Sequence, residues 1–260
     1  METNLKALAQ IVDDAARHAR AVPQLSAARA LSLADAYEVQ RASIELREER
    51  GENRIGLKMG FTSRAKMLQM GIDDVIWGRL TDAMLVEEGG TISFAHYIHP
   101  RVEPEVAFLL RESLPGKVTA AQALESVAAV APALEIIDSR YQDFKFSLPD
   151  VVADNASSSG LVIGPWCAPN TDLGNLGMLL ELDGRVRQIG SSAAILGHPL
   201  RSLVAAARLA AEAGEPLQRG WIVMAGGATA AEALSPGMHV RCVVESLGSC
   251  SFRVGSAAEP

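Results

Sequence analysis

The residues from His99 to Leu110 read His-Pro-Arg-Val-Glu-Pro-Glu-Val-Ala-Phe-Leu-Leu, and this stretch predicts the centre of the fold. Glu103 and Glu105 stand two positions apart, directly before the apolar run that ends at Leu110. Such a run is typical of a strand that enters the core, and its period of two places both carboxylates on one face. Adjacent carboxylates repel each other unless a positive charge lies between them. A divalent cation would supply that charge; the alternative is a solvated strand edge with two exposed glutamates.

A third carboxylate, Glu135, lies inside another apolar run, between a leucine and an isoleucine. Lone buried glutamates are rare because an ionised carboxylate loses its hydration on burial. A metal ion shared with Glu103 and Glu105 would provide a partner. Three oxygen ligands would leave positions on Mg²⁺ or Mn²⁺ for water and a chelating substrate. The alternative is a salt bridge from Glu135 to Arg140 or Arg101, which does not account for the three acids together.

Lys58 lies in the middle of a short apolar strand predicted over residues 55–61, with glycines on both sides. Burying an ammonium group is costly, so a lysine is uncommon at the centre of such a strand. Either its side chain extends to the surface, or it faces a site that contains anions. The residues of the strand alone leave both interpretations open.

Length and composition limit the class of protein. The chain has 260 residues, of which 48% are hydrophobic, and this length suits one large domain or a domain with a small appendage. A net charge of −7 argues against a nucleic-acid partner. Three cysteines show no metal-ligand spacing, which favours a reducing compartment. With no signal-peptide pattern at the start and no apolar run of about 20 residues, we expect a cytoplasmic protein without membrane contact.

The order of predicted elements favours an α+β fold. An amphipathic helix is predicted over residues 4–20, and Ser32 begins a second helix to Arg50 as its N-cap, with Asp35 completing a capping box. These helices form a predicted N-terminal helical segment, residues 1–52, followed by a catalytic domain, residues 53–260. Within that domain we expect helices over 119–130 and 199–213, a hairpin turning at Asp183-Gly184, and strands of uneven length.

Five segments together resemble the hydratase/decarboxylase branch of the fumarylacetoacetate hydrolase superfamily, and the similarity extends over essentially the whole chain. They are Gly56-Leu57-Lys58-Met59-Gly60-Phe61-Thr62-Ser63, Glu103-Pro104-Glu105, Leu134-Glu135-Ile136-Ile137-Asp138-Ser139-Arg140, Ala153-Asp154-Asn155-Ala156-Ser157 and Gly226-Gly227-Ala228-Thr229. The resemblance implies a distorted, barrel-like β-roll. It also implies that Glu103, Glu105 and Glu135 hold Mg²⁺ or Mn²⁺, that Lys58 is catalytic, and that Ser157 lies at the substrate carboxylate and assists catalysis.

The resemblance also implies that one position helps to separate the two activities of the branch. Hydratases of this branch carry an aspartate directly before an aromatic-glycine pair, in the loop that follows the lysine segment. Here that loop is predicted over residues 72–80, after a short helix that ends at Gly71, and Ile76 occupies the position. Hydration needs an acid–base group near the distal end of the substrate, whereas isoleucine would help to desolvate a leaving carboxylate. We therefore predict that Ile76 and Gly71 belong to the substrate-binding site of a decarboxylase.

The resemblance then implies decarboxylation of 2-oxo-3-hexenedioate (4-oxalocrotonate) to 2-oxopent-4-enoate and CO2, in the meta-cleavage catabolism of aromatic compounds. Hydration of 2-hydroxypenta-2,4-dienoate is the alternative activity. Hydrolysis of acylpyruvates is a less favoured alternative, since the N-terminal part shows no His-Glu pair to activate water. A non-catalytic partner subunit is disfavoured, because the three glutamates and Lys58 are all present. A 2-oxo dicarboxylate substrate, a homo-oligomer and a complex with the pathway hydratase are the expected partners.

Overall fold

The computed structural model describes residues 5–28, 30–64, 67–68 and 71–256. The helices are α1 (Leu5–Arg17), α2 (Leu25–Ala28), α3 (Leu33–Glu49), α5 (Ala120–Glu125), α6 (Leu148–Ala153) and α7 (Pro199–Glu212). The 3₁₀ turns are η1 (Asp82–Met84), η2 (Phe94–His96), η3 (Gln142–Phe144), η4 (Asn155–Ser157) and η5 (Ser192–Ala194). The strands are β1 (Arg54–Gly60), β2 (Ile76–Thr81), β3 (Leu85–Val86), β4 (Thr91–Ile92), β5 (Arg101–Leu110), β6 (Val127–Ile137), β7 (Ser158–Ile163), β8 (Gly177–Leu182), β9 (Arg185–Ser191), β10 (Ile222–Met224), β11 (Glu232–Ala233), β12 (His239–Val244) and β13 (Gly248–Val254).

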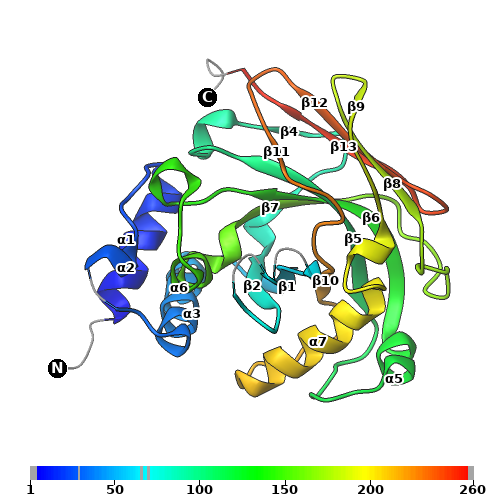
Figure 1. Ribbon diagram of the computed structural model, residues 1–260, viewed down its shortest axis with the longest axis horizontal. Helices are drawn as coiled ribbons and strands as arrows, with labels where there is room; N and C mark the ends of the chain where they lie inside the picture. The colour runs from blue at the N-terminus through cyan, green and yellow to red at the C-terminus, as the bar shows by residue number, and fades with distance from the viewer. Residues whose placement is uncertain (1–4, 29, 65–66, 69–70, 257–260) are drawn as a thin grey trace.

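The described strands form two sheets. The larger follows the order β2-β1-β10-β5-β6-β7-β3, with β11 paired to β5, and the smaller follows β4-β13-β12-β8-β9. Figure 1 shows the smaller sheet at the upper right, and its strands β12 and β13 pack against β6. The larger sheet curls, so that β2 at one edge also contacts β7 and η4 near the other. This architecture confirms the predicted α+β class with a barrel-like core.

The N-terminal helices pack against the elements that hold the site. Figure 1 shows α1, α2 and α3 gathered beside α6, on the far side of the molecule from α5. The predicted capping box at Ser32 is confirmed. On α3, the Tyr37 ring stacks on Trp77 of β2 with 5.4 Å between centroids, and Gln40 Nε2 donates to the Trp77 and Val152 carbonyl oxygens. The N-terminal segment therefore supports β2 and α6, and its separation as residues 1–52 stays a prediction.

Two local predictions were wrong. The helix that begins after Thr119 ends at Glu125 rather than near residue 130, because the next residues form β6 and pair with β5 along almost its whole length. That pairing overrides the helix preference of the alanines in the run. Residues 76–81 form strand β2 rather than a loop, because they pair antiparallel with β1. In both segments, partners distant in sequence decide the structure.

Other predicted elements are confirmed, including the hairpin at Asp183-Gly184 and the helix that starts at Pro199. The short helix predicted before Gly71 cannot be followed throughout, since residues 65–66 and 69–70 lie outside the described ranges. Within the described ranges, every helix is too short or too polar to cross a membrane.

Candidate metal centre and active site

Three glutamates meet on the inner face of the curled sheet. Glu103 on β5 lies directly opposite Glu135 on β6, and Glu105 follows two residues further along β5. All three are buried, with exposed fractions of 7%, 0% and 0% for Glu103, Glu105 and Glu135. One oxygen from each carboxylate lies within 4.8 Å of the others. Like charges placed directly opposite each other destabilise a sheet, so this arrangement needs a compensating positive charge.

The surroundings of the glutamates fit a hard divalent cation. Burial raises the pKa of both Glu105 and Glu135; mutual repulsion adds to the effect and Lys58 opposes it. Among the described residues, Glu105 Oε1 and Glu135 Oε1 have no hydrogen-bonding partner. Such oxygens in a dry site are costly unless they bind something. An ion held by three carboxylate oxygens would remove both the repulsion and the unmet bonding capacity.

Two glycines of the segment after β10 make room for the carboxylates. The Gly226 N–H donates to Glu105 Oε2 at 2.7 Å. A Cβ on Gly227 would lie 2.3 Å from Glu103 Oε2, which no side chain could accept without displacing that carboxylate. The segment Gly226-Gly227 thus lets backbone approach the acids closely, a role that only glycine can fill here.

Lys58 on β1 faces the glutamates rather than solvent. Its Nζ lies 2.9 Å from Glu135 Oε2 and donates to the Ala156 carbonyl oxygen at 3.1 Å, and the residue is 4% exposed. Burial by itself lowers the pKa of Lys58, but the three glutamates more than offset this and raise it above the ordinary value. The side chain is therefore a buried ammonium group at the edge of the carboxylate cluster.

The turn η4 presents Ser157 to the same space. Its three residues all have left-handed φ values, 50°, 51° and 60° for Asn155, Ala156 and Ser157. The Asn155 side chain stabilises this strained backbone because Oδ1 accepts from the Arg79 N–H at 2.7 Å and Nδ2 donates to the Arg79 carbonyl at 2.8 Å. Ser157 is 3% exposed, and its Oγ has no hydrogen-bonding partner among the described residues. Its hydroxyl is therefore available to donate a hydrogen bond within the cavity that Ser157 lines.

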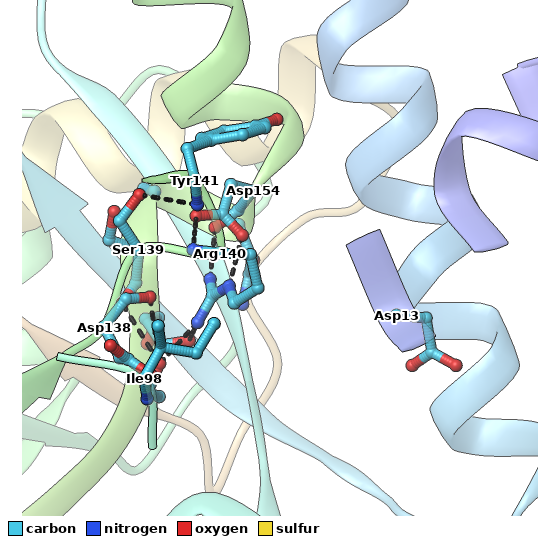
Figure 2. A network of polar contacts seen from close by, with 12 residues as sticks. Asp13, Ile98, Asp138, Ser139, Arg140, Tyr141 and Asp154 are labelled. Carbon is cyan, nitrogen blue, oxygen red and sulfur yellow. Dashed lines mark hydrogen bonds and ion pairs between the residues drawn. The ribbon is translucent and has the colours of Figure 1, made fainter. Parts of the chain in front are cut away.

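A buried ion pair holds the turn at its start. Figure 2 shows Arg140 beside Asp154, within a network that includes Ser139 and Tyr141. The Arg140 guanidinium bonds the Asp154 carboxylate, donates to the Asp154 carbonyl at 2.6 Å and reaches Ser159 Oγ at 2.5 Å. Burial raises the pKa of Asp154 to about 6, although Arg140 opposes this effect. Arg140 thus forms its ion pair with Asp154, and the alternative in which it pairs with Glu135 is wrong.

A cavity of about 380 Å³ opens onto these groups. Lys58, Glu103, Ser157 and Ile76 line it, so four of the predicted site residues share one space. Gly71 does not belong to this lining and is exposed, and a Cβ there would meet nothing within 4 Å. The assignment of Gly71 to the substrate-binding site therefore stays a prediction.

Further lining residues were not predicted. They come from β5, the last residue of β6, the segment before α6, α6 itself and the segment before β11, and are Arg101, Ile137, Phe144, Phe146, Val151, Ala230 and Ala231. Gly60, Phe61 and Ala156 line the cavity beside the predicted residues. The alternation along β5 could have indicated Arg101, which lies two positions before Glu103. The two phenylalanines follow an irregular loop, and no pattern in the sequence places them.

Comparison with known proteins identifies the family. The family model described as "Fumarylacetoacetate (FAA) hydrolase C-terminal" matches residues 60–255. The chain belongs to the fumarylacetoacetate hydrolase family. Its match to a "4-oxalocrotonate decarboxylase" from Pseudomonas sp is 61% identical and covers 94% of this chain and 96% of the relative. A "2-hydroxyhexa-2,4-dienoate hydratase" from Comamonas testosteroni is 33% identical, with 86% of each chain covered.

A solved structure of the same family agrees with the fold. It is the 4-oxalocrotonate decarboxylase from Pseudomonas putida G7, complexed with magnesium and adipate. The superposition gives a TM-score of 0.93 at 38% sequence identity, and covers 96% of this chain and 97% of that chain. Among these relatives, the chain is thus more similar to the decarboxylases than to the hydratase.

The burial of Glu105 has a consequence for stability. Since the folded protein holds the Glu105 proton to a higher pH than the unfolded chain does, the metal-free protein should lose stability as the pH rises above the ordinary value of 4.5. The slope for one proton is at most about 1.4 kcal/mol per pH unit. Glu105→Gln removes this titration and still offers an oxygen to the Gly226 N–H.

Urea unfolding at pH 5 and pH 8 in the presence of a chelator measures this effect. We expect Glu105→Gln to exceed wild type in stability at pH 8 and to approach it at pH 5. Excess Mg²⁺ should reverse the order at pH 8, because only the wild type keeps three charged ligands. If Glu105→Gln is less stable than wild type in chelator at pH 8, the ionised Glu105 carboxylate does not destabilise the metal-free protein.

Proposed function

We propose that this protein decarboxylates 2-oxo-3-hexenedioate to 2-oxopent-4-enoate, or its dienol, and CO2, with Mg²⁺ or Mn²⁺ held by Glu103, Glu105 and Glu135. The observation that carries the proposal is the buried carboxylate triad, which opens onto a cavity that Ile76 lines where a hydratase would carry an acid. The 61% identity to a 4-oxalocrotonate decarboxylase supports it, as does the solved relative that binds magnesium and a six-carbon diacid.

The reaction breaks the C5–C6 bond of the substrate. The electron pair of that bond forms a C4–C5 double bond, the former C3–C4 double bond moves to C2–C3, and negative charge arrives on the C2 oxygen. The product is a dienolate that takes up one proton. A divalent cation, when bound, supplies positive charge that stabilises an oxyanion of a chelated 2-oxo acid. The protein must then bind the substrate, shield its distal end from water and provide a proton.

Several of the residues that line the cavity suit these tasks. The Lys58 ammonium group keeps its proton at neutral pH, and lies where it can stabilise charge on the C2 oxygen or donate that proton. Ser157 Oγ is free to donate to the C1 carboxylate. Ile76, Phe144 and Phe146 exclude water from the distal part of the substrate. Loss of hydration favours departure of CO2 from a carboxylate.

Hydration of 2-hydroxypenta-2,4-dienoate remains the competing activity, because the same groups would bind its 2-oxo acid end. It needs an acid–base group at the distal end, and Glu103 is the one carboxylate among the described cavity-lining residues. The test is to incubate the Mg²⁺-loaded protein with each compound separately. We expect CO2 from the diacid and little change in the dienoate. Efficient hydration of the dienoate with an untouched diacid would overturn the proposal.

Substitution of Ile76 by aspartate tests the branch assignment. Two like charges about 4 Å apart repel by roughly 4 kcal/mol at an effective dielectric constant of 20, and half of that costs more than tenfold in kcat/KM. We therefore expect Ile76→Asp to lose at least about tenfold in kcat/KM for the diacid, and much less in its handling of the dienoate, which lacks a second carboxylate.

Ile76→Asn is the matched control, since it brings a polar group of the same size without charge. Steady-state kinetics of wild type and both variants should separate the effect of charge from that of polarity. Equal losses in the two variants would show that Ile76 acts through packing and not through its distance from the leaving carboxylate.

A further inference from the structure

The cavity contains a positive charge that the proposed reaction steps do not use. Among the described residues that line it, only Lys58 and Arg101 are cationic. Lys58 is engaged by Glu135 and by the Ala156 carbonyl. Arg101 is exposed, and within the described part of the chain no carboxylate pairs with it. An unpaired guanidinium among the residues that line the cavity is available to an anionic ligand.

Arg101 lies on the same face of β5 as the metal ligand Glu103. The two residues are two positions apart, so their Cα atoms are about 6.7 Å apart along the strand. Both line the cavity. A six-carbon diacid bound at the metal through its 2-oxo acid end spans a comparable length. Its second carboxylate would then lie within reach of the long Arg101 side chain.

An aromatic ring supports the guanidinium. The Arg101 Cζ lies 4.2 Å from the centroid of Phe144, which itself lines the cavity. Stacking on a ring is a property of the planar guanidinium, and it leaves the N–H edge free for two parallel hydrogen bonds to a carboxylate. Phe144 reaches this place through a backbone with left-handed φ at Asp143 and Phe144, 58° and 57°.

We propose that Arg101 binds the substrate carboxylate that is lost as CO2, and that it thereby selects dicarboxylates over monocarboxylates. This inference rests on the proposed function and adds a specificity-determining residue to it. A cation on that carboxylate stabilises the bound substrate at least as much as the transition state, in which the negative charge leaves that end. Arg101 therefore contributes to KM and to the choice of substrate, and not to the rate of bond cleavage.

The test compares Mg²⁺-loaded wild type, Arg101→Gln and Arg101→Lys. For Arg101→Gln we expect KM for the diacid to rise by roughly tenfold or more, the loss typical of a charge-assisted hydrogen bond, while kcat changes by less than about threefold. Arg101→Lys keeps the positive charge but loses the two parallel N–H donors of the guanidinium, so its KM should lie between those of wild type and Arg101→Gln. Arg253→Gln on β13, which removes an exposed charge outside the cavity lining, is the matched control and should behave as wild type.

Dissociation constants of the Mg²⁺-loaded proteins, measured by calorimetry without substrate, provide a readout that does not depend on turnover. We expect 2-oxoadipate to bind wild type more tightly than 2-oxohexanoate, and Arg101→Gln to lose this preference while its affinity for 2-oxohexanoate stays the same. If Arg101→Gln keeps the preference for 2-oxoadipate, or loses affinity for both ligands equally, the role of Arg101 is wrong even if wild type releases CO2. If wild type fails to decarboxylate the diacid, the proposed function fails, while the preference for 2-oxoadipate still decides the role of Arg101.

Discussion

Replacing Lys58 with methionine is expected to lower kcat for the diacid by about 10²-fold or more, the scale of a positioned proton donor or charge-stabilising group. The reason is its position, since the ammonium group lies 2.9 Å from Glu135 Oε2 and also lines the cavity. Methionine keeps most of the volume of the side chain and removes the charge. Steady-state kinetics at saturating Mg²⁺ would measure the loss.

Binding of Mn²⁺ to Lys58→Met separates a catalytic role from a structural one. The ammonium group repels a cation placed among the glutamates, so its removal should leave the affinity for Mn²⁺ unchanged or higher. The metal-free variant should be less stable, because the buried carboxylates lose their counter-charge. Lys117→Met, at an exposed position outside the cavity lining, is the control and should change neither property. Wild-type kcat in Lys58→Met would contradict the role given to this residue.

Replacing Arg140 with methionine is expected to destabilise the protein by about 3–5 kcal/mol, the usual effect of leaving one partner of a buried ion pair alone. Asp154 is fully buried and would lose its counter-charge. The penalty should shrink as the pH falls from 8 towards 5, because the pKa of Asp154 is already raised to about 6 and a protonated carboxyl needs no cation.

Arg208→Met is a matched control for Arg140→Met, since it breaks ion pairs with Asp74 and Glu212 in which the arginine side chain is 30% exposed and the carboxylate side chains are 50% and 52% exposed. Exposed pairs contribute about 1 kcal/mol or less. Urea unfolding at pH 8 and pH 5 would measure both variants. Equal small losses, or a loss in Arg140→Met that does not depend on pH, would show that Asp154 is not held as a charged partner.

Local patterns in the sequence predicted the parts of the fold that local physics decides. Ser32 with Asp35 predicts a helix start, and Asp183-Gly184 predicts a hairpin, because each depends on neighbours within a few residues. The alternation of Glu103 and Glu105 predicts one shared face for the same reason. Their convergence with Glu135 was a hypothesis from the scarcity of buried carboxylates, and the register of β5 against β6 explains it.

Other features depend on pairs distant in sequence, which the sequence alone does not indicate. The contact between Lys58 and Glu135 exists because the large sheet curls, and no local pattern shows that curl. Strand β2 was predicted as a loop because its pairing with β1 cannot be seen in residues 72–80 alone. Phe144 supports Arg101 only through an irregular turn with left-handed backbone.

The central claim is that one divalent cation, held by Glu103, Glu105 and Glu135, is required for release of CO2. Titration of Mg²⁺ into metal-free protein, with bound metal and CO2 from the diacid measured in the same samples, tests it most directly. We expect activity to rise in proportion to bound metal and to saturate at one ion per chain, and Glu135→Gln to bind Mg²⁺ far more weakly. Full CO2 release by protein that holds no metal would contradict the claim.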